Sequence, residues 1–337
     1  MTEPGWLDEV PVRRMVEPGL ETRVPLPPGD RPLVEPGAVV LPGDALLDHL
    51  RDRRVEEVEI RSAGDVPPLA GTRWTPAPGR RNHPVQPEGE LLAPVPGRGG
   101  RWRIVTGEHR IGVASTVAGT VVEVRPGAEI RIRVDGLALR GAFAAGAPSR
   151  GRLELATDPF GDLRPGGIDV GRAGSILLVG SRIDAEALTR ARAMGVHGIV
   201  VASLAGKDLR DFQASERRQR AALHPAPPFG VLVLDGALRR PVASPIAELL
   251  ERLAGRDVAL LVDPPSLVFD AADLELPAVA ADWVRVRSGP NAGTEGRVLG
   301  LAGLRRFAAG VQLEAARVSL DDEAPIDIPL GDLERLA

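Results

Sequence analysis

The sequence predicts a multi-domain protein of the β plus α/β class, with an N-terminal β domain, a central α/β domain and a small C-terminal β-barrel. Three observations predict this organisation. The chain has 337 residues, whereas a single domain usually holds roughly 100–200. Its middle alternates near-continuous apolar runs with helix-like segments, and both flanks carry short Val- and Ile-rich runs separated by turns. We expect the domains over residues 1–160, 165–272 and 280–337.

Composition excludes several kinds of chemistry. The hydrophobic fraction is 43% and the charged fraction 26%, so the chain can form buried cores. There is no cysteine, which excludes disulfides, thiolate catalysis and thiolate metal sites. The five histidines are scattered without the spacing of metal ligands, so we expect no metal site and assign no catalytic residue. The net charge of −4 gives no overall attraction to nucleic acid.

The chain also lacks the patterns of membrane or secreted proteins. It begins MTEPGWLDEV, which has no basic start followed by an apolar run, and no window holds about eighteen apolar residues in a row. We therefore expect a cytoplasmic protein with no contact to a membrane.

Two segments of the N-terminal region read as β-hairpins. Residues 33–47, LVEPGAVVLPGDALL, and residues 111–136 combine alternating apolar positions with Pro-Gly and Asp-Gly turns. Together they resemble the barrel-sandwich hybrid, the fold of biotinyl and lipoyl carriers. That resemblance implies a cofactor-bearing lysine at a hairpin tip, but Lys207 is the only lysine of the chain. We therefore expect a non-carrier scaffold without biotin, lipoate or another cofactor. Residues 64–100, rich in Pro and Gly, read as a long irregular connection.

The central region predicts a three-layer α/β domain with a mainly parallel sheet. Apolar runs predict strands over residues 175–180, 198–204, 229–236 and 257–263. The segments between them predict helices over residues 184–195, 207–223 and 244–255. Ser244 and Pro245 suit the N-cap and first position of the last helix.

The strand ends of this domain are candidates for binding an anion, because ligands of open parallel sheets bind beyond the carboxyl ends of the strands. Small, hydroxyl-bearing and charged residues gather there, next to helix N-termini. They are Gly180, Ser181, Ser203, Lys207, Asp235 and Gly236. The alternative interpretation is that they are ordinary loop and cap residues.

The C-terminal segment carries the most specific motif. Residues 284–298, VRVRSGPNAGTEGRV, resemble the KOW module of the elongation factor NusG and of some ribosomal proteins. The resemblance places Gly289, Pro290, Gly293 and Gly296 in the module's turn. The residues agree with it, because glycines at 289 and 293 can adopt positive φ and glycine at 296 allows a close backbone approach. We expect residues 280–337 to fold as a separate barrel.

Charge in this segment suggests a binding face. Its early part carries a basic set, Arg285, Arg287, Arg297, Arg305 and Arg306. Such a patch suits phosphate contacts. The alternative is a solvated strand whose arginines pair with the acidic residues that follow. Residues 282–337 hold seven Arg against nine Asp and Glu and few aromatics, so a protein partner is favoured over RNA.

Two functions remain open from the sequence. The first is a non-enzymatic adaptor or scaffold that binds a macromolecular partner through its β modules. The second is an enzyme or anion-binding protein that uses the strand ends of the central sheet. An adaptor should expose the basic patch at 285–306, whereas an enzyme should bring polar side chains together in an open pocket.

Overall fold

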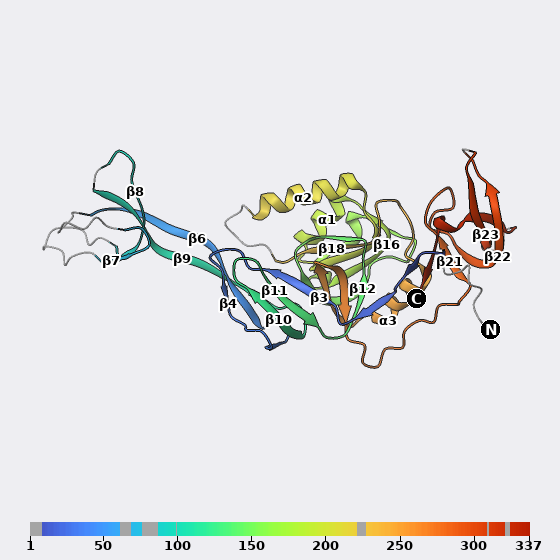
Figure 1. Cartoon of the computed structure of the whole chain (residues 1–337), viewed down its shortest axis with the longest axis horizontal. Helices are drawn as coiled ribbons and strands as arrows, with labels where there is room; N and C mark the ends of the chain where they lie inside the picture. The colour runs from blue at the N-terminus through green and yellow to red at the C-terminus, as the bar shows by residue number, and fades with distance from the viewer. Residues whose placement is uncertain are drawn as a thin grey trace. The chain divides into compact units, whose positions relative to one another are not determined.

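The computed structural model describes residues 9–60, 69–75, 87–98, 100–220, 227–308, 310–320 and 324–337 (Figure 1). The chain forms two compact units. Unit 1 holds residues 1–23, 116–120 and 132–337, and unit 2 holds residues 24–115 and 121–131. The division therefore differs from the three domains expected, because the C-terminal segment belongs to the same unit as the α/β sheet.

A ten-stranded sheet forms the centre of unit 1. Nine strands lie in the order β13 (Phe143–Gly146), β18 (Gly230–Gly236), β17 (Gly198–Ser203), β16 (Ile176–Ile183), β14 (Ser149–Leu155), β19 (Asp257–Val262), β20 (Pro265–Phe269), β12 (Leu137–Arg140) and β2 (Val16–Pro18), and β15 (Asp162–Leu163) pairs with β16. Neighbours among β14, β16, β17 and β18 are parallel.

The sheet as a whole is mixed, which corrects the expectation of a mainly parallel one. The fourth predicted strand, β19, runs antiparallel to both β14 and β20. Its apolar run could not reveal this, because a strand that is covered on both faces shows the same pattern in either direction. Strands β12, β13 and β14 lie within residues 1–160 but belong to this sheet.

Helices cover both faces of the sheet, because its buried residues alternate between two cores. Leu178, Val200 and Leu232 pack in one core with α3 (Ser244–Leu253). The residues that follow them, such as Val179, pack in a second core with α1 (Ala185–Ala193) and Phe212 of α2 (Gly206–Arg220). Figure 1 shows α1 and α2 on the face opposite α3.

A six-stranded sheet contains the C-terminal segment. Its order is β1 (Val12–Arg13), β25 (Leu333–Leu336), β21 (Trp283–Val286), β22 (Glu295–Arg306), β23 (Gln312–Leu320) and β24 (Ile326–Pro329). Val10, Val284, Val286 and Val318 share its core. In the described part of the chain no pairing joins β24 to β1, so the sheet is open rather than a closed barrel. The sequence did not predict that β1, from the N-terminal region, is its edge strand, parallel to β25.

Unit 2 is built of β-strands. A five-stranded sheet has the order β4 (Arg31–Pro32), β6 (Ala45–Glu59), β9 (Arg101–Ala114), β8 (Gly89–Pro94) and β7 (Arg73–Trp74). The unit also holds most of a four-stranded sheet, with the order β3 (Glu21–Pro25), β11 (Glu129–Val134), β10 (Gly119–Arg125) and β5 (Val39–Val40).

The expected hairpin segments of this region do lie together. Leu47, from residues 33–47, pairs with Val113, from residues 111–136. The Pro/Gly-rich insert is not wholly irregular, because its described part contains β7 and β8. Leu91 of β8 packs against Ile104 in a small core, which explains why a strand forms there. Residues 64–68, 76–86 and 99 of the insert lie outside the described residues.

Candidate functional site

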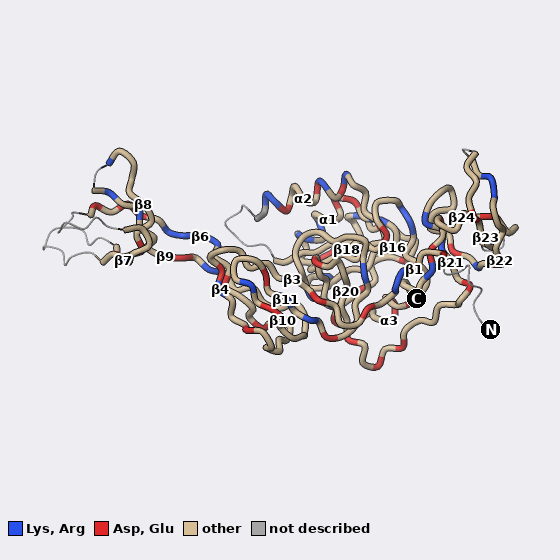
Figure 2. Tube along the Cα trace, in the orientation of Figure 1, with Lys and Arg blue, Asp and Glu red and all other residues tan. Residues whose placement is uncertain are grey.

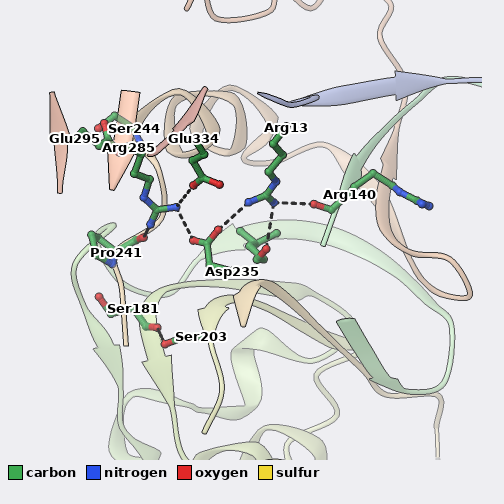
Figure 3. Close-up of polar contacts among 11 residues, drawn as sticks. Arg13, Arg140, Ser181, Ser203, Asp235, Pro241, Ser244, Arg285, Glu295 and Glu334 are labelled. Atoms are coloured by element: carbon green, nitrogen blue, oxygen red, sulfur yellow. Dashed lines mark hydrogen bonds and ion pairs between the residues drawn. The ribbon is translucent and has the colours of Figure 1, made fainter. Parts of the chain in front are cut away.

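The strand-end site predicted from the sequence is occupied by the chain itself. Asp235 stands at the end of β18, and its two carboxylate oxygens accept from different arginines (Figure 3). Nη1 of Arg13 lies 2.8 Å from Oδ1, and Nη1 of Arg285 lies 3.0 Å from Oδ2. The Asp235 side chain is only 4% exposed. Each carboxylate oxygen is therefore paired with an internal cation, and the group is almost wholly buried.

Arg285 is the most deeply buried charged group of this cluster. Its side chain has no exposed area, and Glu334 of the neighbouring strand lies 3.5 Å away as a second anion. Nη2 donates to the carbonyl oxygen of Pro241 at 2.6 Å. A buried guanidinium needs its charge and its donors compensated, and these partners balance the charge and bond both Nη atoms, whereas the buried Nε has no hydrogen-bond partner among the described residues. Arg285 thus holds β21 against the end of β18.

The serine hydroxyls that were predicted to bind a ligand at the strand ends donate hydrogen bonds to backbone carbonyls instead. Oγ of Ser203 donates to the Ser181 carbonyl at 2.7 Å (Figure 3). Oγ of Ser181 donates to the Phe160 carbonyl at 2.9 Å. Gly180 is required by space, since a Cβ there would come within 2.0 Å of the Asp158 carbonyl oxygen.

The other predicted ligands do not complete an anion site. Lys207 is exposed at the start of α2. Gly236 has φ of 114° and accepts a backbone hydrogen bond from Leu204. At the strand ends, Asp235 pairs with two arginines of the chain, and both serines donate to backbone carbonyls. This arrangement fits the alternative interpretation, ordinary loop and cap residues, better than an anion-binding site.

A second polar contact joins the C-terminal sheet to the α/β part. Oε1 of Glu295 accepts from the backbone N–H of Ser244 at 2.7 Å, and Oε2 lies 3.2 Å from Nε1 of Trp283. The N-cap residue of α3 is Ala243, not Ser244 as predicted, and it has no side-chain oxygen to offer. The carboxylate of Glu295 therefore caps the helix from another element, where the positive end of the helix dipole favours an anion.

The turn that follows β21 has the backbone conformation that its glycines allow. Gly289 and Gly293 adopt φ of 83° and 93°. Gly296 lies so close to the next strand that a Cβ would come within 2.3 Å of the Ser319 carbonyl oxygen. Pro290 is exposed.

The five arginines of the predicted basic patch do not form one surface. Arg285 is buried, whereas Arg287, Arg297 and Arg306 are exposed. Arg305 is also exposed, and its Nε lies 2.8 Å from Oδ2 of Asp327. Alternation along a strand could not identify this difference, because the partner that buries Arg285 comes from a distant part of the chain.

Asp327 neutralises part of the positive charge of these arginines. The sequence offered this as the alternative to a binding face, namely arginines that pair with the acidic residues that follow. Its carboxylate accepts from Arg317 at 3.0 Å as well as from Arg305. These hydrogen bonds, first from Arg317 and then from Arg305, hold the pKa of Asp327 below its usual value. The same bond raises the pKa of Arg317.

The ribbon formed by residues 299–308 and 310–316, from β22, β23 and their connection, exposes apolar side chains that sequence reasoning missed. Residues directly opposite on paired strands share a face, so Leu301 lies on the face of Ala316, and Leu304 on the face of Glu314. Ala316 belongs to the buried core of the sheet. Leu301 and Leu304 continue that face but are 47% and 61% exposed. Leu299, Val311 and Leu313 are also exposed on the ribbon.

The outer part of the ribbon has no further strand beside it. Within the described residues, β21 pairs with Glu295–Arg297 of β22 and β24 with Ala315–Val318 of β23. The stretch in which 304–306 face 312–314 is therefore two-stranded, whereas Leu301 lies opposite Ala316, which still pairs with β24. Figure 1 shows the ribbon projecting beyond these neighbours, and Figure 2 shows both basic and acidic positions along it. A strict alternation of apolar and polar residues would have revealed such a face, but two irregularities in register, after Val298 and after Leu301, break the alternation.

Comparisons with known proteins identify no family: a scan of the sequence against protein-family models and a search of curated proteins both give no match. Across the described residues, no helix has the length and apolar character needed to cross a membrane. The same residues contain no group of three or more His, Asp or Glu side chains placed to hold a metal ion.

Proposed function

We propose that the chain is a non-enzymatic adaptor that binds a protein partner through its β modules, with the β22–β23 ribbon as the docking element. The observation that carries this proposal is the exposure of Leu301 and Leu304 on a face that is continuous with a buried core. A two-stranded ribbon is marginally stable alone, and it gains stability when a partner covers its apolar face. The resemblance to KOW modules supports the same assignment.

The chemistry of the ribbon defines the partner. Its centre is aliphatic, and three exposed arginines lie along β22: Arg306, Arg297, whose Nη1 is 4.0 Å from Oδ2 of Asp282, and Arg305, which already pairs with Asp327. We therefore expect an apolar protein surface with acidic residues at its edge, which is the usual arrangement of an interface core and its polar rim. The strand-end alternative is less well supported, because Asp235 and both serines are engaged internally.

A comparison of variants in affinity capture from native lysate tests the proposal. The test variant is Leu301→Ser with Leu304→Ser, and the control is Leu238→Ser, which alters an equally exposed leucine elsewhere in unit 1. A protein that wild type and control retain after nuclease treatment, and that the double variant loses, should bind purified wild-type chain directly. Loss of an apolar contact centre typically weakens binding by tenfold or more.

Two outcomes would overturn the proposal. If the double variant retains every bound protein, the ribbon is not the docking element. If nuclease abolishes capture, and filter binding at low salt shows that Arg297→Ala with Arg306→Ala weakens RNA binding, the partner is RNA. Arg285 is unsuitable for this test, because its replacement would disturb the fold.

A further inference from the structure

A small apolar pocket opens beyond the carboxyl end of β14, beside Leu178 and Gly180 of β16. It has a volume of about 120 Å³. Leu178, Val242 and Ala247 line it and are themselves buried. Leu155, at the end of β14, is 44% exposed and also lines it. Strand β16 and helix α3 therefore build this pocket within the α/β core.

The size of the pocket limits what it can hold. Drug-sized ligands need pockets of roughly 300–1,000 Å³, whereas an apolar cavity of about 150 Å³ is enough for benzene. The pocket thus suits one compact hydrocarbon group, such as a single ring or a branched chain of about six carbons.

The charged residues that line the pocket are acidic. Both of them, Asp158 and Glu251, are exposed carboxylates. Oδ1 of Asp158 accepts from the Phe160 N–H at 2.9 Å. Glu251 lies in the last turn of α3, where the negative end of the helix dipole also favours a nearby cation.

We propose that this pocket binds a small organic cation, in which a compact apolar body enters the pocket and an ammonium group faces Asp158 and Glu251. The polarity is opposite to the anion expected at the strand ends from the sequence. The proposal does not depend on the adaptor function, because it uses no residue of the β22–β23 ribbon.

Titration of the full-length protein with benzylamine and benzyl alcohol, followed by NMR, tests this proposal. The two probes share the ring, but only the amine is charged at neutral pH. We expect benzylamine to shift signals of the pocket residues at millimolar concentration and to bind several-fold more tightly than benzyl alcohol. Glu251→Gln should lower the affinity for benzylamine about threefold and leave that for benzyl alcohol unchanged.

Two further variants complete the test. Ala247→Leu fills the pocket and should abolish binding of both probes, while Glu186→Gln, which removes an exposed carboxylate from α1, should change neither. Glu251→Gln alters an exposed side chain and keeps the test decisive if Ala247→Leu fails to fold. The proposal is overturned if benzylamine does not bind, if both probes bind equally, or if Glu186→Gln has the same effect as Glu251→Gln.

Discussion

Asp235 is the residue on which the polar contacts inside unit 1 converge. It balances the charge of Arg285, which is fully buried, and of Arg13, which is 23% exposed. Removing the anion leaves two guanidinium groups short of a partner, and an uncompensated buried charge costs several kcal/mol. The cluster therefore stabilises the unit only as long as it is complete.

We expect Asp235→Ala to lower the free energy of unfolding by about 3–5 kcal/mol. Arg13→Ala should cost less, because its side chain is partly solvated. Urea unfolding followed by tryptophan fluorescence measures both values. Asp162→Ala is the control, since it breaks an exposed ion pair with Arg239, and exposed pairs contribute roughly 0–1 kcal/mol. Equal losses for Asp235→Ala and Asp162→Ala would contradict the prediction.

Asp327 makes the stability depend on pH. Its pKa is lowered in the folded state by hydrogen bonds from Arg317 and Arg305. The stabilisation is therefore fully present above the pKa of the unfolded chain, about 3.9, and is lost as pH falls through the lower pKa of the folded state. Wild type should unfold at higher urea concentration than Asp327→Asn at pH 6, and the difference should shrink below about pH 4. A difference that persists unchanged at pH 2 would disprove this.

For single residues, the sequence predicts where the backbone needs a glycine better than it predicts which residues a side chain will contact. The turn glycines Gly289 and Gly293 are recognisable because positive φ is a local property. The burial of Arg285 is not, because its counter-ion is 50 residues away in another sheet. An arginine between two valines in a strand has the same pattern whether it meets solvent or a buried carboxylate.

The edge strand β1 shows how elements far apart in the sequence form one sheet. Val10, which precedes it, is 1% exposed and packs with Val284 and Leu333 in the core of the six-stranded sheet. The C-terminal segment therefore lacks one strand and one core residue when residues 9–15 are absent, although the sequence predicts that 280–337 is a separate barrel.

We expect residues 280–337, expressed alone, to show poor amide dispersion by NMR. The same fragment joined to residues 9–15 through a flexible Gly/Ser linker should gain dispersion, because the linker supplies β1 and Val10. Replacement of Val10 by Ser in the linked fragment is the control and should remove the gain. A well-dispersed spectrum from 280–337 alone would show that β1 is dispensable and that the sequence-based prediction of independence is right.

The sequence predicted where the strands of the α/β part lie along the chain, but not which strands lie next to one another in the sheet. Apolar runs placed β16, β17 and β18 within three residues of their ends. Burial on both faces produces such runs locally. Strand order and direction depend on contacts between distant segments, so the antiparallel β19 and the addition of β12 to β14 had no local signal.

At the scale of the whole molecule, the position of Lys207 decides whether the chain can be a carrier. It lies in the first turn of α2, exposed, and not at the tip of a hairpin. We therefore expect the protein purified from its native host to carry neither biotin nor lipoate. Intact-mass spectrometry measures this directly, with a Lys207→Arg variant as reference. An added mass equal to either cofactor, absent from the variant, would contradict the expectation.

The division of the chain into two units could not be read from the sequence for a similar reason. Chain length and the change between β-type and alternating strand–helix segments predicted three domains, yet residues 9–23 supply β1 and β2 to sheets whose other strands come much later. A boundary drawn from composition separates neighbours in sequence, whereas a compact unit is defined by neighbours in space.

The parallel pairing of β1 with β25 has a mechanical consequence. The backbone hydrogen bonds that join the two strands and their flanking residues include those from Arg335 N to Pro11 O, from Ala337 N to Arg13 O and from Met15 N to Ala337 O. Tension applied between the residue ahead of β1 and the last residue of β25 would slide two parallel strands past each other along their length. These bonds then bear the load together instead of opening one at a time, so this edge of the sheet should resist pulling in shear far better than a hairpin that unzips.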